Sequence, residues 1–163
     1  NAAAEKIGWG KPAPNGRYRG LSVLKAFNSY VAGAAEISVT DGNKVKVHRL
    51  VGATDPGYAV NPAQIERQVA GSFVYGLSGA FMQECTVKDG RIEQTNFHEY
   101  NSMRIAQMTK VETVVLQGGG PVWGGIGEPT ICVAAPAVMN AFYRATGKRI
   151  RSVPFKNQGL ELV

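Results

Sequence analysis

The chain has 163 residues, enough for one ordinary domain or for part of a larger one. Hydrophobic residues make up 44% and charged residues 18%, a balance that favours a folded core over a disordered segment. The net charge of +6 suggests a nucleic-acid partner, but the densest basic patch is only Lys148, Arg149 and Arg151, so none is expected. No run reaches the roughly 18 apolar residues of a membrane-spanning helix.

The two cysteines, Cys85 and Cys132, lie far apart and form no C-x-x-C pair. A structural zinc site or an iron–sulfur cluster needs more thiolate ligands than these. We therefore expect no metal ligands in this chain. We expect both cysteines to be buried free thiols, and a disulfide between them is the alternative.

The first eight residues are typical of the last turns of a helix that ends at Gly8. The sequence lacks an initiator Met, so we expect the chain to begin inside a longer polypeptide. Residues 1–8 would then complete a helix of an upstream segment, and residues 9–163 would form one α+β unit.

An irregular connection is expected over residues 9–20, where Gly and Pro recur and where Arg17 and Arg19 are predicted to be solvated. Strands are predicted over 21–31 and 34–40, followed by an Asp41-Gly42-Asn43 turn and a return strand over 44–53.

Alternation along that return strand predicts two faces. Val45, Val47, Arg49 and Val51 would share one face, and Lys46, His48 and Leu50 the other, with His48 facing solvent. Just beyond it, Asp55 is predicted to bond nearby backbone N–H groups in a turn.

A helix of about 22 residues is predicted from Asn61-Pro62, with Asn as the cap and Pro in the first turn. Its core stripe recurs every four residues: Ile65, Val69, Phe73, Leu77 and Phe81. Three interior glycines, Gly71, Gly76 and Gly79, imply that another helix, a strand or a ligand comes very close to its backbone.

The remaining elements alternate in the same way. They are a second hairpin (86–88 and 91–97), a polar excursion (98–110), a central strand (111–117), a glycine-rich loop (118–129), a helix (130–146) that ends at Gly147, and a short strand (150–153). We expect one face of the last helix to carry Ile131, Ala135, Val138, Met139 and Phe142. Hairpins alternating with two long helices indicate the α+β class.

The glycine-rich loop leads directly into a helix N-terminus, where free N–H groups favour an anion. It matches neither the P-loop nor the dinucleotide-binding fingerprint. Glu128, followed by Pro129, ends the loop and is either a general base or a cap of its helix; spacing alone leaves both open. Trp123 is a candidate wall of a substrate pocket, with a core or interface position as the alternative.

Several stretches resemble, in the right order, the molybdopterin-binding large subunits of the xanthine dehydrogenase/aldehyde oxidase family, and more narrowly the isoquinoline 1-oxidoreductase β-subunit type. They are residues 16–20, Ala53-Thr-Asp-Pro-Gly-Tyr-Ala-Val-Asn-Pro62, Gln68-Val-Ala-Gly71 with Tyr75-Gly-Leu77, Asn96-Phe-His-Glu-Tyr100, Gly124-Gly-Ile-Gly-Glu-Pro129 and residues 140–151. Residues 1–163 would form the C-terminal part of a molybdopterin-binding domain.

The resemblance implies roles for particular residues. Glu128 matches the catalytic base, Gln68 matches a contact to the pterin, and Gly71 belongs to the same helical turn. Gly125, Ile126 and Gly127 would offer backbone groups to the cofactor.

The implied reaction is oxidative hydroxylation of an N-heterocycle or an aldehyde at a molybdenum centre. The implied cofactor is molybdopterin, in its cytosine dinucleotide form, and its dithiolene holds the metal without protein ligands.

Implied partners are the upstream remainder of the large subunit, a small subunit with 2Fe–2S clusters, and a cytochrome as a candidate electron acceptor. The isolated chain would bind no molybdenum and would be inactive. The alternative is a non-catalytic domain whose loop binds an anion or a partner chain.

Overall fold

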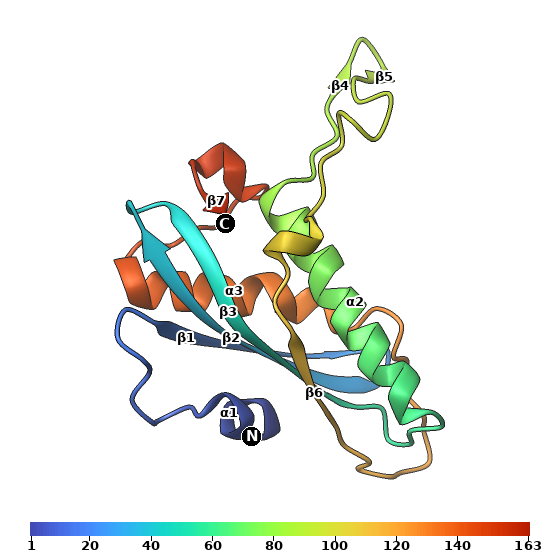
Figure 1. Ribbon diagram of the computed structural model, residues 1–163. Coiled ribbons are helices and arrows are strands. Elements are labelled where there is room, and N and C mark those ends of the chain that lie inside the picture. Colours follow the sequence, from blue (N-terminus) through green and yellow to red (C-terminus); the bar gives the residue numbers. More distant parts are fainter.

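The computed structural model describes residues 1–163 and has the α+β architecture that the sequence predicts (Figure 1). Three antiparallel strands form a meander: β1 (Tyr18–Ala26), β2 (Ser29–Thr40) and β3 (Lys44–Asp55). Two further strands, β6 (Val111–Val115) and β7 (Glu161–Leu162), pair in parallel with β3. The helices are α1 (Ala2–Ile7), α2 (Pro62–Phe81) and α3 (Ile131–Thr146), with short 3-10 turns η1 (Ile105–Gln107) and η2 (Phe155–Gln158).

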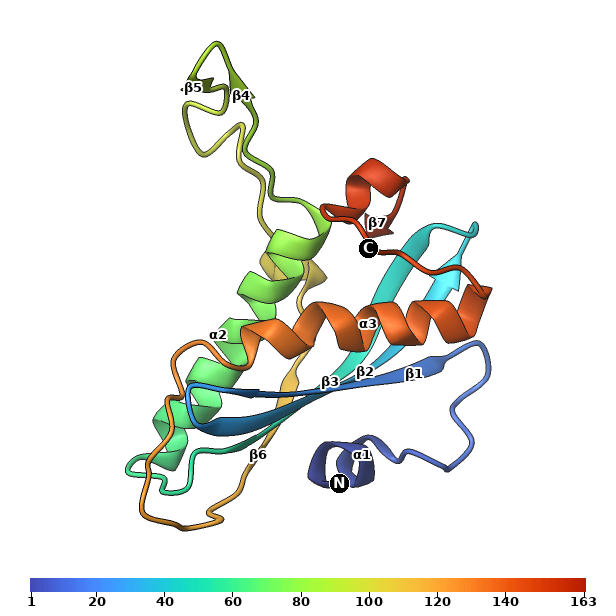
Figure 2. The same ribbon diagram turned by 180° about the vertical axis from the view of Figure 1, so that it is seen from behind.

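The sheet is covered unequally on its two faces (Figures 1 and 2). Helices α2 and α3 cover one face and enclose the main core, whose largest fully buried side chains include Phe73, Phe81 and Phe142. The short helix α1 lies on the other face, over a second core of five buried residues: Ala3, Ile7, Ala34, Val51 and Ala53. Helix α1 ends at Gly8, which adopts the left-handed conformation, as predicted. No helix of this fold combines the length and apolarity that crossing a membrane requires.

Helix α2 begins and packs as the sequence predicts. The side chain of Asn61 accepts a hydrogen bond from the backbone N–H of Gln64 (3.2 Å), and Pro62 occupies the first helical position. All five residues of the predicted stripe are buried: Ile65, Val69, Phe73, Leu77 and Phe81. This stripe fixes which side of α2 faces the sheet and therefore which side remains exposed.

Helix α3 lies directly on the backbone of β1 and β2, because glycines remove the side chains between them. A Cβ at Gly20 would overlap the carbonyl oxygen of Ala137, and one at Gly33 would come within 2.7 Å of the carbonyl oxygen of Val133. Ser22 Oγ donates to that same Val133 oxygen (2.6 Å). The position of α3, and of the loop that leads into it, is therefore set by backbone-to-backbone contact.

Helices α2 and α3 also approach closely at one of the predicted glycines. A Cβ at Gly76 would lie 2.8 Å from both the carbonyl oxygen of Ile131 and the Cβ of Ala134. Packing against a helix thus explains Gly76. Gly79 meets only the flexible end of Gln83, and Gly71 has nothing within 4 Å, so close packing explains neither.

The predicted face of α3 is only partly correct. Val138 and Phe142 are buried, whereas Ile131, Ala135 and Met139 are half-buried, the last two against the main core. The helix presents small residues to the sheet instead, and Ala134, Ala137 and Ala141 are fully buried. Small side chains are needed there because the sheet backbone comes so close. Gly147 ends the helix in the left-handed conformation, as expected.

The predicted break between strands 21–31 and 34–40 is wrong. The turn falls at Phe27 and Asn28, which both have positive φ (50° and 61°), and β2 runs without interruption from Ser29 to Thr40. Asn adopts this conformation more readily than most residues, but Phe does not, so the turn carries little sequence signal. The predicted turn at Asp41-Gly42 is confirmed, since β2 pairs with β3 across it.

The predicted faces of β3 are wrong beyond Val47 because the strand contains a bulge. Ile37 pairs with Val47, but Glu36 pairs with Arg49, which leaves His48 as the extra residue. Leu50 consequently packs in the main core with Val45 and Val47, and Val51 faces the core under α1. His48 is half-buried and bonds Ser38 Oγ through Nε2 (2.8 Å); burial and the charges of Arg17 and Lys46 lower its pKa.

Arg17 and Arg19 are not solvated charges, contrary to expectation. Both pair with Glu36, whose side chain is only 1% exposed, at 3.0 Å and 2.8 Å. Burial is the largest single influence and opposes ionisation of Glu36, but the hydrogen bonds and positive charges of the two arginines together outweigh it and hold the pKa of this carboxyl below its ordinary value. Arg19 also donates to the carbonyl oxygens of Gly8 and Lys11. Arg17 and Arg19 therefore connect the segment after α1 to Glu36 in the middle of the sheet.

Three further expectations are corrected. The strand at 111–117 was predicted to be central, but β6 is an outer strand of half-buried residues. The predicted strand at 150–153 does not form; the final strand is β7, which contains the buried Leu162 and follows the buried Leu160. Both Cys85 and Cys132 are free but exposed rather than buried.

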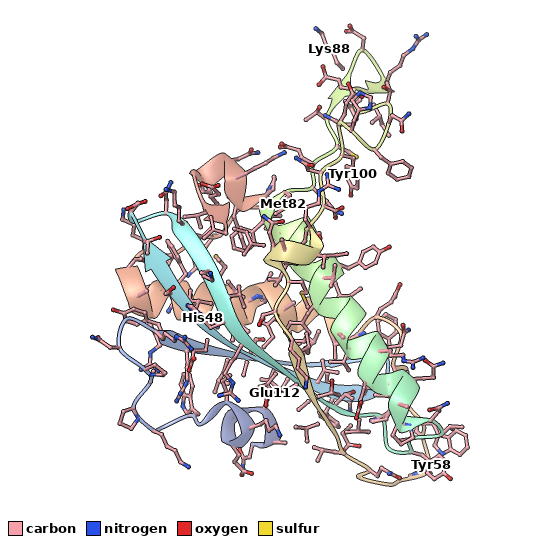
Figure 3. All side chains as sticks on the ribbon, viewed as in Figure 1. His48, Tyr58, Met82, Lys88, Tyr100 and Glu112 are labelled. Atoms are coloured by element: carbon pink, nitrogen blue, oxygen red, sulfur yellow. The ribbon has the colours of Figure 1, made fainter.

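The second hairpin forms an arm, residues 83–100, that projects from the body of the fold (Figure 1). Its turn at Asp89 and Gly90 is as predicted, but the strands are only two residues each: β4 (Val87–Lys88) and β5 (Arg91–Ile92). Figure 3 shows Lys88 at the far end of the arm and Tyr100 near its base.

Candidate functional site

The glycine-rich loop connects the end of β6 to the start of α3, and it passes the exposed side of α2. Four α2 residues at helical spacing line that side: Gln64, Gln68, Gly71 and Tyr75, all exposed. The fold therefore brings together two segments that the sequence singled out separately.

The first part of the loop is held by the end of β3. Asp55 Oδ1 accepts hydrogen bonds from the backbone N–H groups of Gly57 and Gly118, both at 3.0 Å. The N–H of Gly119 in turn donates to the carbonyl of Gly57 (3.0 Å). The predicted turn role of Asp55 is confirmed, and the same carboxylate also fixes the loop.

The second part of the loop is held by the β1–β2 turn. Gly125 donates its N–H to the carbonyl of Phe27 (2.8 Å), and its own carbonyl accepts from Ser29 Oγ (2.6 Å). Gly124 donates to the carbonyl of Pro56 (2.8 Å), and a Cβ there would overlap Ser29. Packing within the chain thus requires a glycine at position 124, whereas a Cβ at Gly125 would make a tight contact of 3.1 Å with the Cβ of Phe27. Neither Phe27 nor Ser29 carries a sequence signal for this role, because the turn at Phe27 and Asn28 lies inside the predicted strand over 21–31.

The next three residues, Ile126, Gly127 and Glu128, have backbone N–H groups with no acceptor inside the chain. A Cβ at Gly127 would lie 3.9 Å from the side-chain nitrogen of Gln68. Three free donors beside a side-chain amide suit an anionic or polar ligand. Gly125, by contrast, has both backbone groups occupied within the chain.

Glu128 is exposed, and its carboxylate forms no hydrogen bond or ion pair within the chain. Helix α3 begins three residues later, at Ile131, and receives no side-chain cap; only the carbonyl of Glu128 accepts from the N–H of Ile131 (2.9 Å). The side chain of Glu128 is therefore not a cap of α3 in this fold.

An aromatic pair stands beside the loop. Tyr58 and Trp123 stack with ring centroids 5.1 Å apart at 23°, and they are 54% and 65% exposed. Figure 3 shows Tyr58 at the end of the molecule where α2 begins. Trp123 is thus not in the core of this fold; its pocket and interface roles both stay open.

The side chains here do not form a protein metal site. No three His, Cys, Asp or Glu residues come together in the chain. The loop and α2 instead offer backbone N–H groups, one amide and one carboxylate, a donor set that suits contacts to an organic, anionic cofactor.

The fold and this loop form one α+β unit, and the sequence assigns it to a cofactor-binding family. Over residues 13–109 the sequence matches the family described as the molybdopterin cofactor-binding domain. The chain belongs to this family, which confirms the resemblance drawn from its motifs. The matched segment includes Gln68 and Gly71 and ends before the glycine-rich loop.

The curated relatives include subunits of oxidoreductases. The chain is 30% identical over 145 residues to the isoquinoline 1-oxidoreductase subunit beta of Brevundimonas diminuta, covering 88% of this chain and 18% of that protein. It is 30% identical over 118 residues to the aldehyde oxidoreductase molybdenum-binding subunit of Escherichia coli, covering 68% and 16%. The chain thus spans less than a fifth of the length of either relative.

Solved structures share the fold. The quinoline 2-oxidoreductase of Pseudomonas putida matches with a TM-score of 0.69 and 20% identity, over 78% of this chain and 17% of that chain. The aldehyde oxidoreductase of Desulfovibrio desulfuricans matches with a TM-score of 0.65 and 22% identity, over 77% and 14%.

Proposed function

We propose that this chain is the C-terminal part of a molybdenum hydroxylase large subunit and that Glu128 is its catalytic base. The observation that carries the proposal is the position of Glu128: it directly follows Gly127, which faces Gln68, and its carboxylate has no partner within the chain. A base has to keep its lone pairs available for substrate, and this carboxylate does.

The loop and α2 would hold the cofactor from two sides. Gln68 would donate its side-chain amide, and the free N–H groups of Ile126 and Gly127 would donate to oxygen atoms of the same cofactor. Gly71 lies one turn after Gln68 with open space above it, so that the cofactor could pass close to the helix. Gly125 would act indirectly, since its backbone groups fix the loop.

When bound, the molybdopterin cofactor supplies the oxidising centre. The contribution of this chain is a proton transfer: the carboxylate of Glu128 takes a proton from the oxygen nucleophile as that oxygen attacks the electrophilic carbon of an N-heterocycle or an aldehyde. We further propose the cytosine dinucleotide form of the cofactor, a small subunit with 2Fe–2S clusters as the first electron acceptor, and a cytochrome as a later one.

The remaining pieces of such a site would come from the rest of the large subunit. The isolated 163-residue chain is therefore proposed to bind no molybdenum and to be inactive. Stoichiometric molybdenum in the purified chain, measured by elemental analysis, would contradict this.

Replacement of Glu128 by Gln in the full-length enzyme tests the proposal. Loss of a general base should lower kcat by about 10²-fold or more while the molybdenum content stays unchanged. Glu66→Gln is the matched control, since Glu66 is an exposed α2 residue without an ion pair. Near-normal turnover of the Glu128 variant would leave the alternative, a non-catalytic domain whose loop binds an anion or a partner chain.

A further inference from the structure

The positive charge of this chain gathers at one end of the fold. There the loop between α1 and β1 lies beside the C-terminal end of α3 (Figures 1 and 2). Four basic residues line one hollow there: Lys11, Arg17, Arg19 and Arg144. Lys148 and Arg149 follow directly after the end of α3, and the six residues together are called the basic end. The sequence alone identified only the last two as part of a patch, because Lys11, Arg17 and Arg19 come from a segment far away along the chain.

Most of this charge is not neutralised within the chain. Of the six residues, only Arg17 and Arg19 form ion pairs, and both pair with Glu36. Lys11, Arg144, Lys148 and Arg149 have no acidic partner within 4.0 Å. Nothing in the proposed cofactor site uses these residues, since the glycine-rich loop lies at the opposite end of α3.

Two of the arginines are fixed in orientation by aromatic rings. The guanidinium of Arg144 lies 4.9 Å from the ring centre of Trp9, and that of Arg149 lies 3.7 Å from the ring centre of Tyr143. Arg149 also donates through Nη1 to Asn140 Oδ1 (3.2 Å), whereas Arg144 forms no hydrogen bond within the chain, so its N–H groups remain free to donate. A planar guanidinium held in this way can form two parallel hydrogen bonds to one carboxylate.

The basic end also has a hollow of about 470 Å³, lined by Trp9, Lys11, Arg17, Arg19, Arg144 and neighbouring loop residues. A hollow of this size is large enough to receive a few side chains of another protein. It does not form the long positive track that a nucleic-acid strand needs, and the rings of Trp9 and Tyr143 are already stacked on arginines rather than available to bases.

We propose that the basic end docks a carboxylate-rich segment of a partner protein. The pre-oriented guanidinium groups favour carboxylates, and the hollow favours a short segment over a long polyanion. This proposal is independent of the role of Glu128, so either can fail without the other.

The test measures binding of a fluorescent peptide of about eight glutamates to the purified protein by anisotropy, at low salt and at physiological salt. Binding should weaken as the salt concentration rises. The triple variant Arg144→Gln, Lys148→Gln, Arg149→Gln should bind about tenfold more weakly, since it removes several exposed charge pairs. The matched control, Lys46→Gln, Lys88→Gln, Arg91→Gln, removes the same charge from exposed positions elsewhere and should stay within about twofold of the unmodified protein.

Two results would overturn the proposal. One is equal loss of binding in the triple variant and the control, which would indicate attraction by net charge alone. The other is tighter binding of a single-stranded DNA of equal charge through the same residues, which would indicate a nucleic-acid partner. Lys148→Glu is a second variant for the case in which the triple variant misfolds, because the Lys148 side chain contacts no partner and its reversal should also weaken binding.

Discussion

Gly127 lies opposite Gln68, so that a Cβ on Gly127 would come within 3.9 Å of the Gln68 side-chain nitrogen. The contact exists because α3 meets α2 at Gly76, which positions the loop before α3 against the exposed side of α2. The proposed contact to a cofactor from both sides depends on this approach.

Gln68→Ala should lower the cofactor content of the full-length enzyme without changing its stability, because the Gln68 side chain forms no hydrogen bond within the chain. Molybdenum per subunit, measured by elemental analysis, is the readout. Gln64→Ala is the control, since Gln64 lies one turn earlier on the same exposed side and should leave molybdenum unchanged. Equal molybdenum in both variants would argue against a pterin contact at Gln68.

Gly71→Ala and Gly79→Ala should separate cofactor contact from helix stability. Neither introduced methyl meets a rigid neighbour, so each should raise the free energy of unfolding by about 0.5–1 kcal/mol. Only the Gly71 variant should lose cofactor, since its methyl would occupy the space proposed for the pterin. Urea unfolding and molybdenum analysis of both variants check this, and retention of cofactor by the Gly71 variant would remove Gly71 from the site.

Gly20→Ala should destabilise the fold strongly, because its methyl would overlap the backbone of α3 at Ala137 and Ala141. Overpacking against backbone costs about 1–3 kcal/mol, and here neither side can rotate away. The same methyl at Gly79 meets only Gln83 Oε1 at 3.6 Å and provides the reference in thermal unfolding. A Gly20 variant as stable as the reference would mean that α3 is not in direct contact with β1.

Glu36→Gln should reduce the free energy of unfolding by about 2 kcal/mol near neutral pH, since it weakens two charged hydrogen bonds at a buried position. The pKa of Glu36 is lower in the folded protein than its ordinary value of 4.5, so its contribution is fully present above that pH. The contribution is lost as the pH falls through the lower folded value. The difference in stability between the two proteins, from urea unfolding across acid pH, should therefore shrink below pH 4.5. A difference that stays constant would exclude linkage to this carboxyl.

Local sequence patterns predicted the elements that are determined by residues within a single segment. The four-residue stripe from Ile65 to Phe81, the Asn61 cap and the Gly147 stop identify both long helices, because burial and capping act within one helix. The Glu128 loop was found by its composition and its place before a helix. The role of Gln68, which faces this loop, was predicted only from the family resemblance, because an exposed Gln in a helix has no distinguishing sequence pattern.

Features that depend on pairing between segments were missed. The bulge at His48 reverses the faces of β3 beyond Val47. The alternation of residues within β3 cannot reveal this bulge, because a bulge depends on how β3 pairs with β2. The buried Glu36 did offer a signal, as the lone charge in a strand otherwise made of small and apolar residues. A buried carboxylate needs a cation, and that requirement points to nearby arginines such as Arg17 and Arg19.

The two attachments of the glycine-rich loop, at Asp55–Gly57 and at the β1–β2 turn, have a consequence for engineering. They divide the loop into a stretch around Pro121 and Val122, which is exposed and has no backbone partner, and a stretch from Ile126 to Glu128, which is anchored immediately before it at Gly125. Insertions or libraries placed at Pro121 and Val122 should reshape the surface beside Trp123 and leave the position of Glu128 unchanged. The chain thus separates a segment that can vary in length from one that has to stay fixed.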